Sequence, residues 1–374
     1  MRLKIGIYIG LDMNKIWDEN NYLSGGIGGS EVWAIRTSDE LAKMGHDVYL
    51  FAFPEKPHIS NTGVKYFQRR DFYFYSTHTD FDAIIISRCL PVMIEKIRCN
   101  NIFIMAHDLE LYNADLAIDL IKTGKIKKIF CLSEFHKQSL INRHPFLNEN
   151  IFSYTRNGID TWLYDKFDGV EKKNKMLCSS GPYRQGIWIA RNIFPLIKKE
   201  VPDFEMNLCH YYDSFDNEVF KQEGINIIAQ PGSPISKEDL VREQCESKIW
   251  VYSNNMIWDL GYATGYFNET FCITALEDAY AKCAIIAGKR SPFTETLSGY
   301  SHFVGENLYP NSLFEMMPSE NCEEFARMLA NEAIRCLKDE NYRLELVKES
   351  YEIAKNSTWE NATSLIENEL VKYF

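Results

Sequence analysis

The sequence has 374 residues, of which 45% are hydrophobic and 14% aromatic, and its formal net charge is −11. A chain of this length and apolar content can bury a large core and is too long for most single domains, so we expect a globular protein of two domains. The acidic balance argues against non-specific binding to phosphate backbones, without excluding a local basic patch.

Ten cysteines occur without any Cys-x-x-Cys pair, and the N-terminus enters an apolar strand without the pattern of a signal peptide. These features favour reduced thiols in a cytoplasmic protein. No apolar run approaches the roughly twenty residues that a membrane span needs, which leaves peripheral contact with a membrane open. No larger cluster of metal ligands is apparent, and an Asp-x-Asp pair at residues 80–82 has a structural interpretation given below, so we expect no bound metal.

The first predicted element is a buried-type strand over Leu3–Ile9, followed by a polar, glycine-rich loop, a helical pattern and a second strand over Val48–Phe53. Gly28 and Gly29 let the backbone approach a ligand at the helix start. A glycine-rich loop between a strand and a helix also occurs in nicotinamide-dependent oxidoreductases, so such an enzyme is an alternative interpretation of this stretch. Its glycines should follow the first strand at once and end in a third Gly, but here the loop is long and Glu31 takes that place.

Two further strands are predicted over residues 81–87 and 101–108. Ligands bind outside the carboxyl ends of parallel strands, so His107, at the exit of the second strand, is placed to meet a substrate hydroxyl. Asp80 and Asp82 look like a metal-binding Asp-x-Asp pair, but they stand at the entrance of a strand. We therefore interpret both aspartates as structural.

The first half of the chain closes with a strand over residues 127–133, a helix capped by Ser133, a strand over 151–154 and a tight turn at 156–160. A charged linker over 165–174 leads to a second domain.

The second domain is predicted to begin with a strand over residues 175–180. Arg184 follows where this strand ends and a helix over 187–197 begins, and its guanidinium suits bidentate contact with phosphate. Strands and helices then alternate at the spacing of a parallel sheet: strands over 204–210, 225–229, 249–253 and 302–304, and helices over 237–245, 321–337 and from 341 onward.

The most informative stretch is Asn268–Gly288, which reads as a loop, a helix capped by Thr270, and a buried strand. The start of this helix leaves backbone N–H groups unpaired at the positive end of the helix dipole, which suits a phosphate. Glu269 precedes the helix and Glu277 lies about two turns inside it, so the two carboxylates would flank a ligand.

Glu269 and Glu277, separated by seven residues, with Phe271 after the first and an alanine-rich helix running into Ala-Ile-Ile-Ala-Gly, resemble the donor-site motif of family 4 retaining glycosyltransferases of GT-B fold. Gly28 and Gly29 resemble the glycine loop of that family's N-terminal domain. Its closing Asn-Gly-Ile-Asp and the tryptophan segment before its last helix have counterparts in residues 157–160 and 357–362.

The resemblance implies that Glu269 holds sugar hydroxyls, Glu277 the ribose, and Arg184 the diphosphate, with His107 near the acceptor. The basic residue expected shortly after Arg184 is replaced by Gln185-Gly186. The expected catalytic residues are Glu269, His107 and Arg184; the expected donor-binding residues are Gly28, Gly29, Arg184, Glu269, Thr270, Phe271, Cys272, Ile273 and Glu277.

The sequence therefore predicts an α/β protein of GT-B fold, with an N-terminal Rossmann-like acceptor domain over residues 1–165, a nucleotide-sugar domain over 166–350, and a C-terminal helix over 351–374 that packs back on the first domain. We expect a metal-independent, retaining hexosyl- or pentosyltransferase that needs no cofactor beyond its nucleoside-diphosphate-sugar substrate. Its acceptor would be a glycan, a lipid-linked sugar or another hydroxyl compound. A modified nucleic-acid base as acceptor, and a non-catalytic sugar-nucleotide-binding subunit, remain the alternatives.

Overall fold

The computed structural model describes residues 1–10, 16–182, 185–210, 217–253, 257–259, 264–266, 269–310, 315 and 317–374; for residue 217 and for 257–259 and 264–266 only the backbone is described. The chain divides into two compact units. The first comprises residues 1–23, 27–158 and 357–374, and the second comprises residues 24–26 and 159–356.

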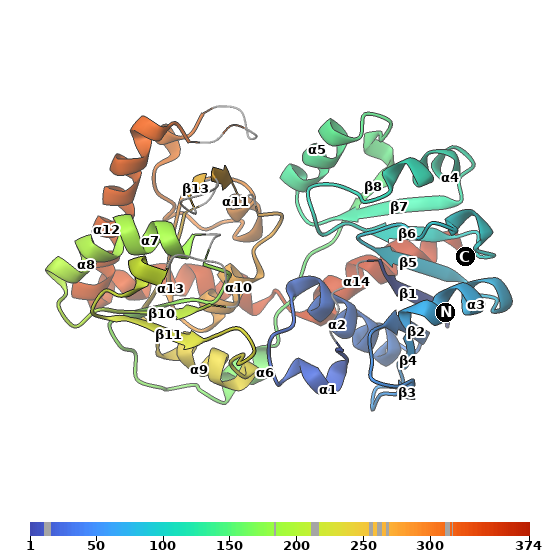
Figure 1. Cartoon of the computed structure of the whole chain (residues 1–374), viewed down its shortest axis with the longest axis horizontal. Helices are drawn as coiled ribbons and strands as arrows, with labels where there is room; N and C mark the ends of the chain where they lie inside the picture. The colour runs from blue at the N-terminus through green and yellow to red at the C-terminus, as the bar shows by residue number, and fades with distance from the viewer. Residues whose placement is uncertain are drawn as a thin grey trace. The chain divides into compact units, whose positions relative to one another are not determined.

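The first unit is built on an eight-stranded sheet with the order β3-β4-β2-β1-β5-β6-β7-β8, whose neighbouring strands are all parallel except β3 and β4 (Figure 1). The strands are β1 (Lys4–Ile9), β2 (Asp47–Ala52), β3 (His58–Ile59), β4 (Lys65–Gln68), β5 (Ala83–Ser87), β6 (Ile102–Met105), β7 (Ile126–Cys131) and β8 (Phe152–Tyr154). Every residue of β5 and β6 is buried. Such continuous apolar runs are typical of parallel strands that are covered on both faces.

The helices of this unit are α1 (Glu19–Tyr22), α2 (Gly29–Lys43), α3 (Phe72–His78), α4 (Ile118–Lys122), α5 (Glu134–Arg143) and α14 (Trp359–Leu370). The C-terminal helix α14 packs against α2, as the sequence predicted for the returning segment. A side chain at Gly158 would place its Cβ 2.2 Å from the backbone nitrogen of Trp359. Glycine is therefore required in this turn because the returning chain passes so close to it.

The order of the strands creates a switch point in the middle of the sheet. β1 pairs with β2 on one side and with β5 on the other, so the connections that leave the carboxyl ends of β1 and β5 run in opposite directions. Ligands of open α/β sheets bind at such a point. The predicted site residues of this unit, Gly28, Gly29 and His107, follow β1 and β6 and therefore belong to this edge of the sheet.

The second unit has a parallel three-stranded sheet, β11-β10-β9, and a parallel pair, β12-β15; a hydrogen bond from Lys248 N to the Lys175 carbonyl (3.2 Å) connects β12 to β9. The strands are β9 (Lys175–Cys178), β10 (Glu205–Cys209), β11 (Ile225–Ala229), β12 (Ile249–Tyr252), β13 (Ile257–Asp259), β14 (Thr264–Tyr266) and β15 (Ala284–Ala287). The helices are α6 (Thr161–Asp165), α7 (Gly186–Asn192), α8 (Phe194–Glu200), α9 (Lys237–Glu246), α10 (Ile273–Tyr280), α11 (Phe293–Thr296), α12 (Cys322–Lys338) and α13 (Glu340–Lys355).

Two element predictions for this unit were wrong. The helix expected over residues 187–197 is two helices, α7 and α8, and Pro195 at the start of α8 lacks the N–H that a continuous helix would use. The strand expected over 302–304 is reduced to a single bridge between Gly288 and Val304. In the described part of the chain, no helix combines the length and apolar character needed to cross a membrane.

Candidate functional site

The start of α10 in the second unit has an unusual backbone. Cys272, not Thr270, is the N-cap residue; it lies in the left-handed region with φ 66° and contributes no side-chain cap, so the prediction that Thr270 caps this helix was wrong. A non-glycine residue is strained in this region, and such strain concentrates at functional sites. Ile273 and Thr274 are only half-buried, and the first amides of a helix have no acceptor within it. The helix start can therefore take an anion.

Glu269 is held in place just before this helix start. Its side chain is buried, with 8% of its surface exposed, and it accepts a hydrogen bond of 2.5 Å from the Tyr252 hydroxyl on β12. The Phe271 side chain is also buried, and its carbonyl accepts a hydrogen bond from the Thr296 hydroxyl on α11. Phe271 can consequently contact a ligand only through its backbone. The Glu269 carboxylate is held in one orientation by the Tyr252 hydroxyl.

Glu277, on α10, forms an ion pair with Lys237 at the first position of α9. Lys237 Nζ lies 2.5 Å from Glu277 Oε1, and their side chains are 15% and 12% exposed respectively. Lys237 was not among the residues that the sequence predicted for this site. The signal was present, since Ser236 caps α9 and Lys237 follows it at once.

The predicted phosphate ligand Arg184 lies outside the described residues. Its neighbour Gln185 is the N-cap residue of α7 and is 3% exposed. The Gln185 amide oxygen accepts a hydrogen bond of 3.2 Å from Ser253 N at the end of β12. The position where a second basic residue was expected is thus occupied by a buried side chain that joins the β9–α7 turn to β12.

In the first unit, Arg88 connects the residues that follow β5 and β6 with the start of α2. Its guanidinium donates to both carboxylate oxygens of Asp108 (2.7 and 2.8 Å) and to Ser30 Oγ (3.0 Å). Arg88 itself has a left-handed backbone with φ 67°. Neither Arg88 nor its role was anticipated from the sequence, because its partners Asp108 and Ser30 are distant from it along the chain.

Gly28 is the N-cap residue of α2, and Gly29 is the first residue of that helix. Glu31 in the first turn is 4% exposed, and a Cβ on Gly28 would lie 2.5 Å from Glu31 Oε2. The carboxylate of Glu31 thus already lies at the positive end of the helix dipole. This end of α2 is therefore better suited to a neutral, hydroxyl-bearing group than to a second anion.

His107 lies beside this helix start. Its ring contacts the Trp33 ring of α2 edge-on, with centroids 5.1 Å apart, and burial together with the nearby Arg88 charge holds the pKa of His107 well below its ordinary value. His107 is therefore neutral at pH 7.

Asp108 is fixed from the other side by His136 on α5, whose Nε2 lies 2.8 Å from the Asp108 carbonyl oxygen. Burial lowers the pKa of His136 to about 4, so this imidazole is also neutral at pH 7. Because the carbonyl can only accept, His136 Nε2 carries the proton. His136 was likewise missed by sequence reasoning.

The structure gathers the predicted residues in two groups. Glu269, Thr270, Phe271, Cys272, Ile273 and Glu277 lie at and within the first two turns of α10 in the second unit. Gly28, Gly29 and His107 lie around the start of α2 in the first unit, where Arg88 connects their neighbours Ser30 and Asp108.

Comparison with known proteins shows a structural likeness and no sequence match. No protein-family profile matches the sequence, and no curated protein matches it either. Sucrose-phosphate synthase from Thermosynechococcus elongatus is similar with a TM-score of 0.67 and 14% identity, over 99% of this chain and 98% of the other. A glycosyltransferase from Rickettsia africae is similar with a TM-score of 0.65 and 14% identity, over 100% and 98%.

A third solved structure, HepE from Anabaena in complex with UDP and glucose, is similar with a TM-score of 0.62 and 13% identity, over 99% of this chain and 100% of the other. At such identities the likeness concerns the fold. Together with the two α/β units and the returning helix α14, it shows that this chain has the GT-B fold that its sequence predicted.

Proposed function

We propose that the protein is a retaining glycosyltransferase that moves a sugar from a nucleoside-diphosphate sugar to a hydroxyl group of an acceptor. The observation that carries this proposal is the placement of two largely buried carboxylates, Glu269 and Glu277, on either side of the strained, half-exposed start of α10. The three solved structures of similar fold named above support it: a sucrose-phosphate synthase, a glycosyltransferase, and HepE in complex with UDP and glucose.

In this proposal the start of α10 receives the diphosphate. Its backbone N–H groups stabilise the negative charge that grows on the leaving diphosphate as the bond to the anomeric carbon breaks. Arg184 adds a planar, charged donor to the same group. Because protein groups neutralise this charge, the reaction requires no divalent cation.

The two glutamates orient the rest of the donor. Glu269, fixed by the Tyr252 hydroxyl, accepts hydrogen bonds from hydroxyls of the transferred sugar. Glu277 accepts from the ribose, and Lys237 holds the Glu277 carboxylate in one orientation. A preoriented acceptor loses less conformational entropy when the ligand binds.

The acceptor lies in the first unit in this proposal. Arg88 is neutralised by Asp108, and the start of α2 already carries Glu31. A neutral hydroxyl compound, such as a glycan or the sugar of a lipid-linked saccharide, therefore fits better than a nucleic acid, and the net charge of −11 points the same way. Neutral His107 exchanges hydrogen bonds with the acceptor hydroxyl.

A thermal-shift panel of nucleoside-diphosphate sugars tests the proposal. A donor at about 100 times its dissociation constant adds about 2.7 kcal/mol to the free energy of unfolding, which raises the melting temperature by several degrees. The donor that shifts most is then incubated with the protein and candidate acceptors. Release of the nucleoside diphosphate is followed, and NMR of the product shows whether the anomeric configuration is retained.

Glu269→Gln serves as the inactive control, because it keeps the shape of the side chain and removes its charge. The proposal fails if no donor in the panel raises the melting temperature. Binding without turnover would instead identify a non-catalytic sugar-nucleotide-binding subunit.

A further inference from the structure

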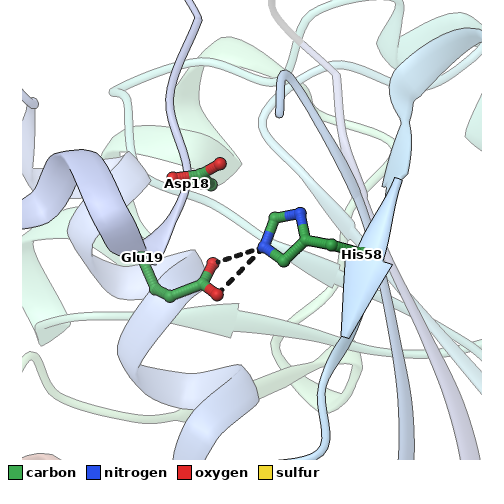
Figure 2. Close-up of side chains that lie close together, drawn as sticks. All are labelled: Asp18, Glu19 and His58. Carbon is green, nitrogen blue, oxygen red and sulfur yellow. Dashed lines mark hydrogen bonds and ion pairs between the residues drawn. The ribbon is translucent and has the colours of Figure 1, made fainter. Parts of the chain in front are cut away.

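Three side chains with metal-ligand chemistry lie together at the edge of the first unit. Asp18 and Glu19 come from the start of α1, and His58 comes from the edge strand β3 (Figure 2). One ligand atom from each side chain lies within 4.8 Å of the others. Asp18 is buried and the other two are half-buried, so the cluster is partly shielded from solvent.

The hydrogen bonds of His58 leave one ring nitrogen facing the carboxylate. Nδ1 lies 3.0 Å from the Lys56 carbonyl oxygen, which only accepts, so Nδ1 carries a proton. Nε2 lies 2.9 and 3.1 Å from the two carboxylate oxygens of Glu19. Figure 2 marks both contacts with dashed lines. His58 Nε2 and the Glu19 oxygens are therefore close enough to bind the same ion. A histidine anchored through Nδ1 to a carbonyl is the usual arrangement of a metal ligand.

Tyr66 packs against the cluster from the neighbouring strand. It pairs with His58 across the antiparallel strands β3 and β4, and the two rings stack with centroids 4.8 Å apart. Its side chain is fully buried, and Glu19 is close enough to its hydroxyl to accept a hydrogen bond from it. A buried donor of this kind holds the carboxylate in position within the cluster.

We propose that Asp18, Glu19 and His58 bind a divalent transition-metal ion, with Zn²⁺ as the best match, and that the Tyr66 hydroxyl donates to a water or carboxylate in its coordination shell. One imidazole nitrogen and two carboxylates are suitable ligands for Zn²⁺, and three protein ligands leave a position for water. Mg²⁺ and Ca²⁺ prefer sites made of oxygen alone.

The local structure supports binding by Asp18. Its Oδ1 caps α1 by accepting from Asn20 N (2.9 Å) and Asn21 N (3.3 Å), which fixes the carboxylate. The ion would join α1 to β3, and α1 directly precedes the glycine-rich loop that leads into α2. The metal therefore has a structural role, and the inference does not depend on the proposed glycosyl transfer.

The test uses the full chain, freed of any affinity tag, stripped of metal with a chelator and desalted. ZnCl₂ is titrated by calorimetry, and Co²⁺ is used as a spectroscopic substitute whose visible absorption reports coordination by protein ligands. His58→Phe keeps a ring to stack on Tyr66 but removes the ligand nitrogen. His78→Phe is the matched control, because His78 is another histidine of this unit that stacks on an aromatic ring, that of Phe74 at 4.5 Å.

We expect the wild type and His78→Phe to bind one more Zn²⁺ than His58→Phe, and only the first two to gain melting temperature with Zn²⁺. Since loss of an outer partner of a metal ligand typically weakens binding about 10- to 100-fold, Tyr66→Phe should weaken it to that extent and His58→Phe by more. Asp18→Asn keeps the helix cap but weakens the ligand, and it should also reduce affinity.

Cysteine thiols that bind Zn²⁺ do so equally in every variant, so only the difference between variants counts. The inference is overturned if His58→Phe binds as much Zn²⁺ as the wild type. It is also overturned if the wild type binds none, because Glu19 and His58 would then be a simple ion pair with a protonated imidazole. If His58→Phe does not fold, Glu19→Gln replaces it with the same expected results.

Discussion

Glu277→Ala should weaken the binding of the nucleoside diphosphate without unfolding the protein. The Glu277 side chain is 12% exposed, so hydrogen bonds that it accepts from ribose hydroxyls are shielded from water. Hydrogen bonds of this kind contribute roughly 1–3 kcal/mol in total, which corresponds to a rise in the dissociation constant of about 5- to 150-fold. The lower part of this range is favoured, because the substitution also frees the Lys237 ammonium to approach the anionic diphosphate.

Calorimetry with the nucleoside diphosphate that gives the largest thermal shift measures this loss. Glu200→Ala is a matched control: it also removes a glutamate that pairs with a lysine in the second unit, Lys338 at 2.8 Å, but both side chains are about half exposed. A surface pair of this kind contributes little to stability, and the control should bind the nucleotide like the wild type. Lys237→Met, alone and combined with Glu277→Ala, measures the coupling between the two partners.

If Glu277→Ala binds the nucleoside diphosphate as tightly as the wild type, the assignment of Glu277 to the ribose is wrong. Equal weakening by Glu277→Ala and Glu200→Ala would point to a general effect on the second unit and would also contradict it.

Three further predictions concern the donor site and the buried carboxyl of Asp278 on α10. Glu269→Ala should leave the affinity for the nucleoside diphosphate unchanged in calorimetry but reduce turnover of the nucleotide sugar; unchanged turnover would remove Glu269 from the site. EDTA should leave turnover unchanged well below the melting temperature, and restoration of lost turnover by Mn²⁺ after chelation would refute metal independence and return attention to Asp80 and Asp82. Arg184→Lys should reduce turnover and Arg184→Ala should reduce it further, because lysine keeps the charge and loses the planar fork. Burial, and then the charge of Glu277, raise the pKa of Asp278 well above its ordinary value. The folded state therefore holds a proton that the unfolded chain releases, and the free energy of unfolding falls as pH rises. Asp278→Asn should therefore stabilise the protein more at pH 8 than at pH 5 in urea unfolding, and equal effects at both pH values would contradict this.

Local sequence determined most of the elements of this fold. The apolar run of β5 predicts a strand buried on both faces, and Ser133 caps α5 by accepting a hydrogen bond from His136 N, as its position indicates. The alternation of such strands with helices predicts parallel sheets. These signals are readable because burial periodicity and helix capping depend on residues only a few positions apart.

The sequence also indicated the stretch around Glu269 and Glu277, because both residues belong to one loop and the helix that follows it. It did not determine the conformation of the loop. Cys272 turns through the left-handed region and shifts the cap from Thr270, since the hydrogen bond from the Thr296 hydroxyl to the Phe271 carbonyl and the Tyr252–Glu269 hydrogen bond fix the chain there.

Only the tertiary structure brought together residues that are distant along the chain. The pairing of Lys237 with Glu277 depends on how α9 and α10 lie in the second unit, and the approach of His58 to Asp18 and Glu19 depends on β3 pairing with β4 at the sheet edge. A single polar residue has no periodicity, so its partner is decided by strand order and helix packing. For that physical reason the sequence predicted the elements and the donor motif, and the fold alone decided the ion pairs and the candidate metal site.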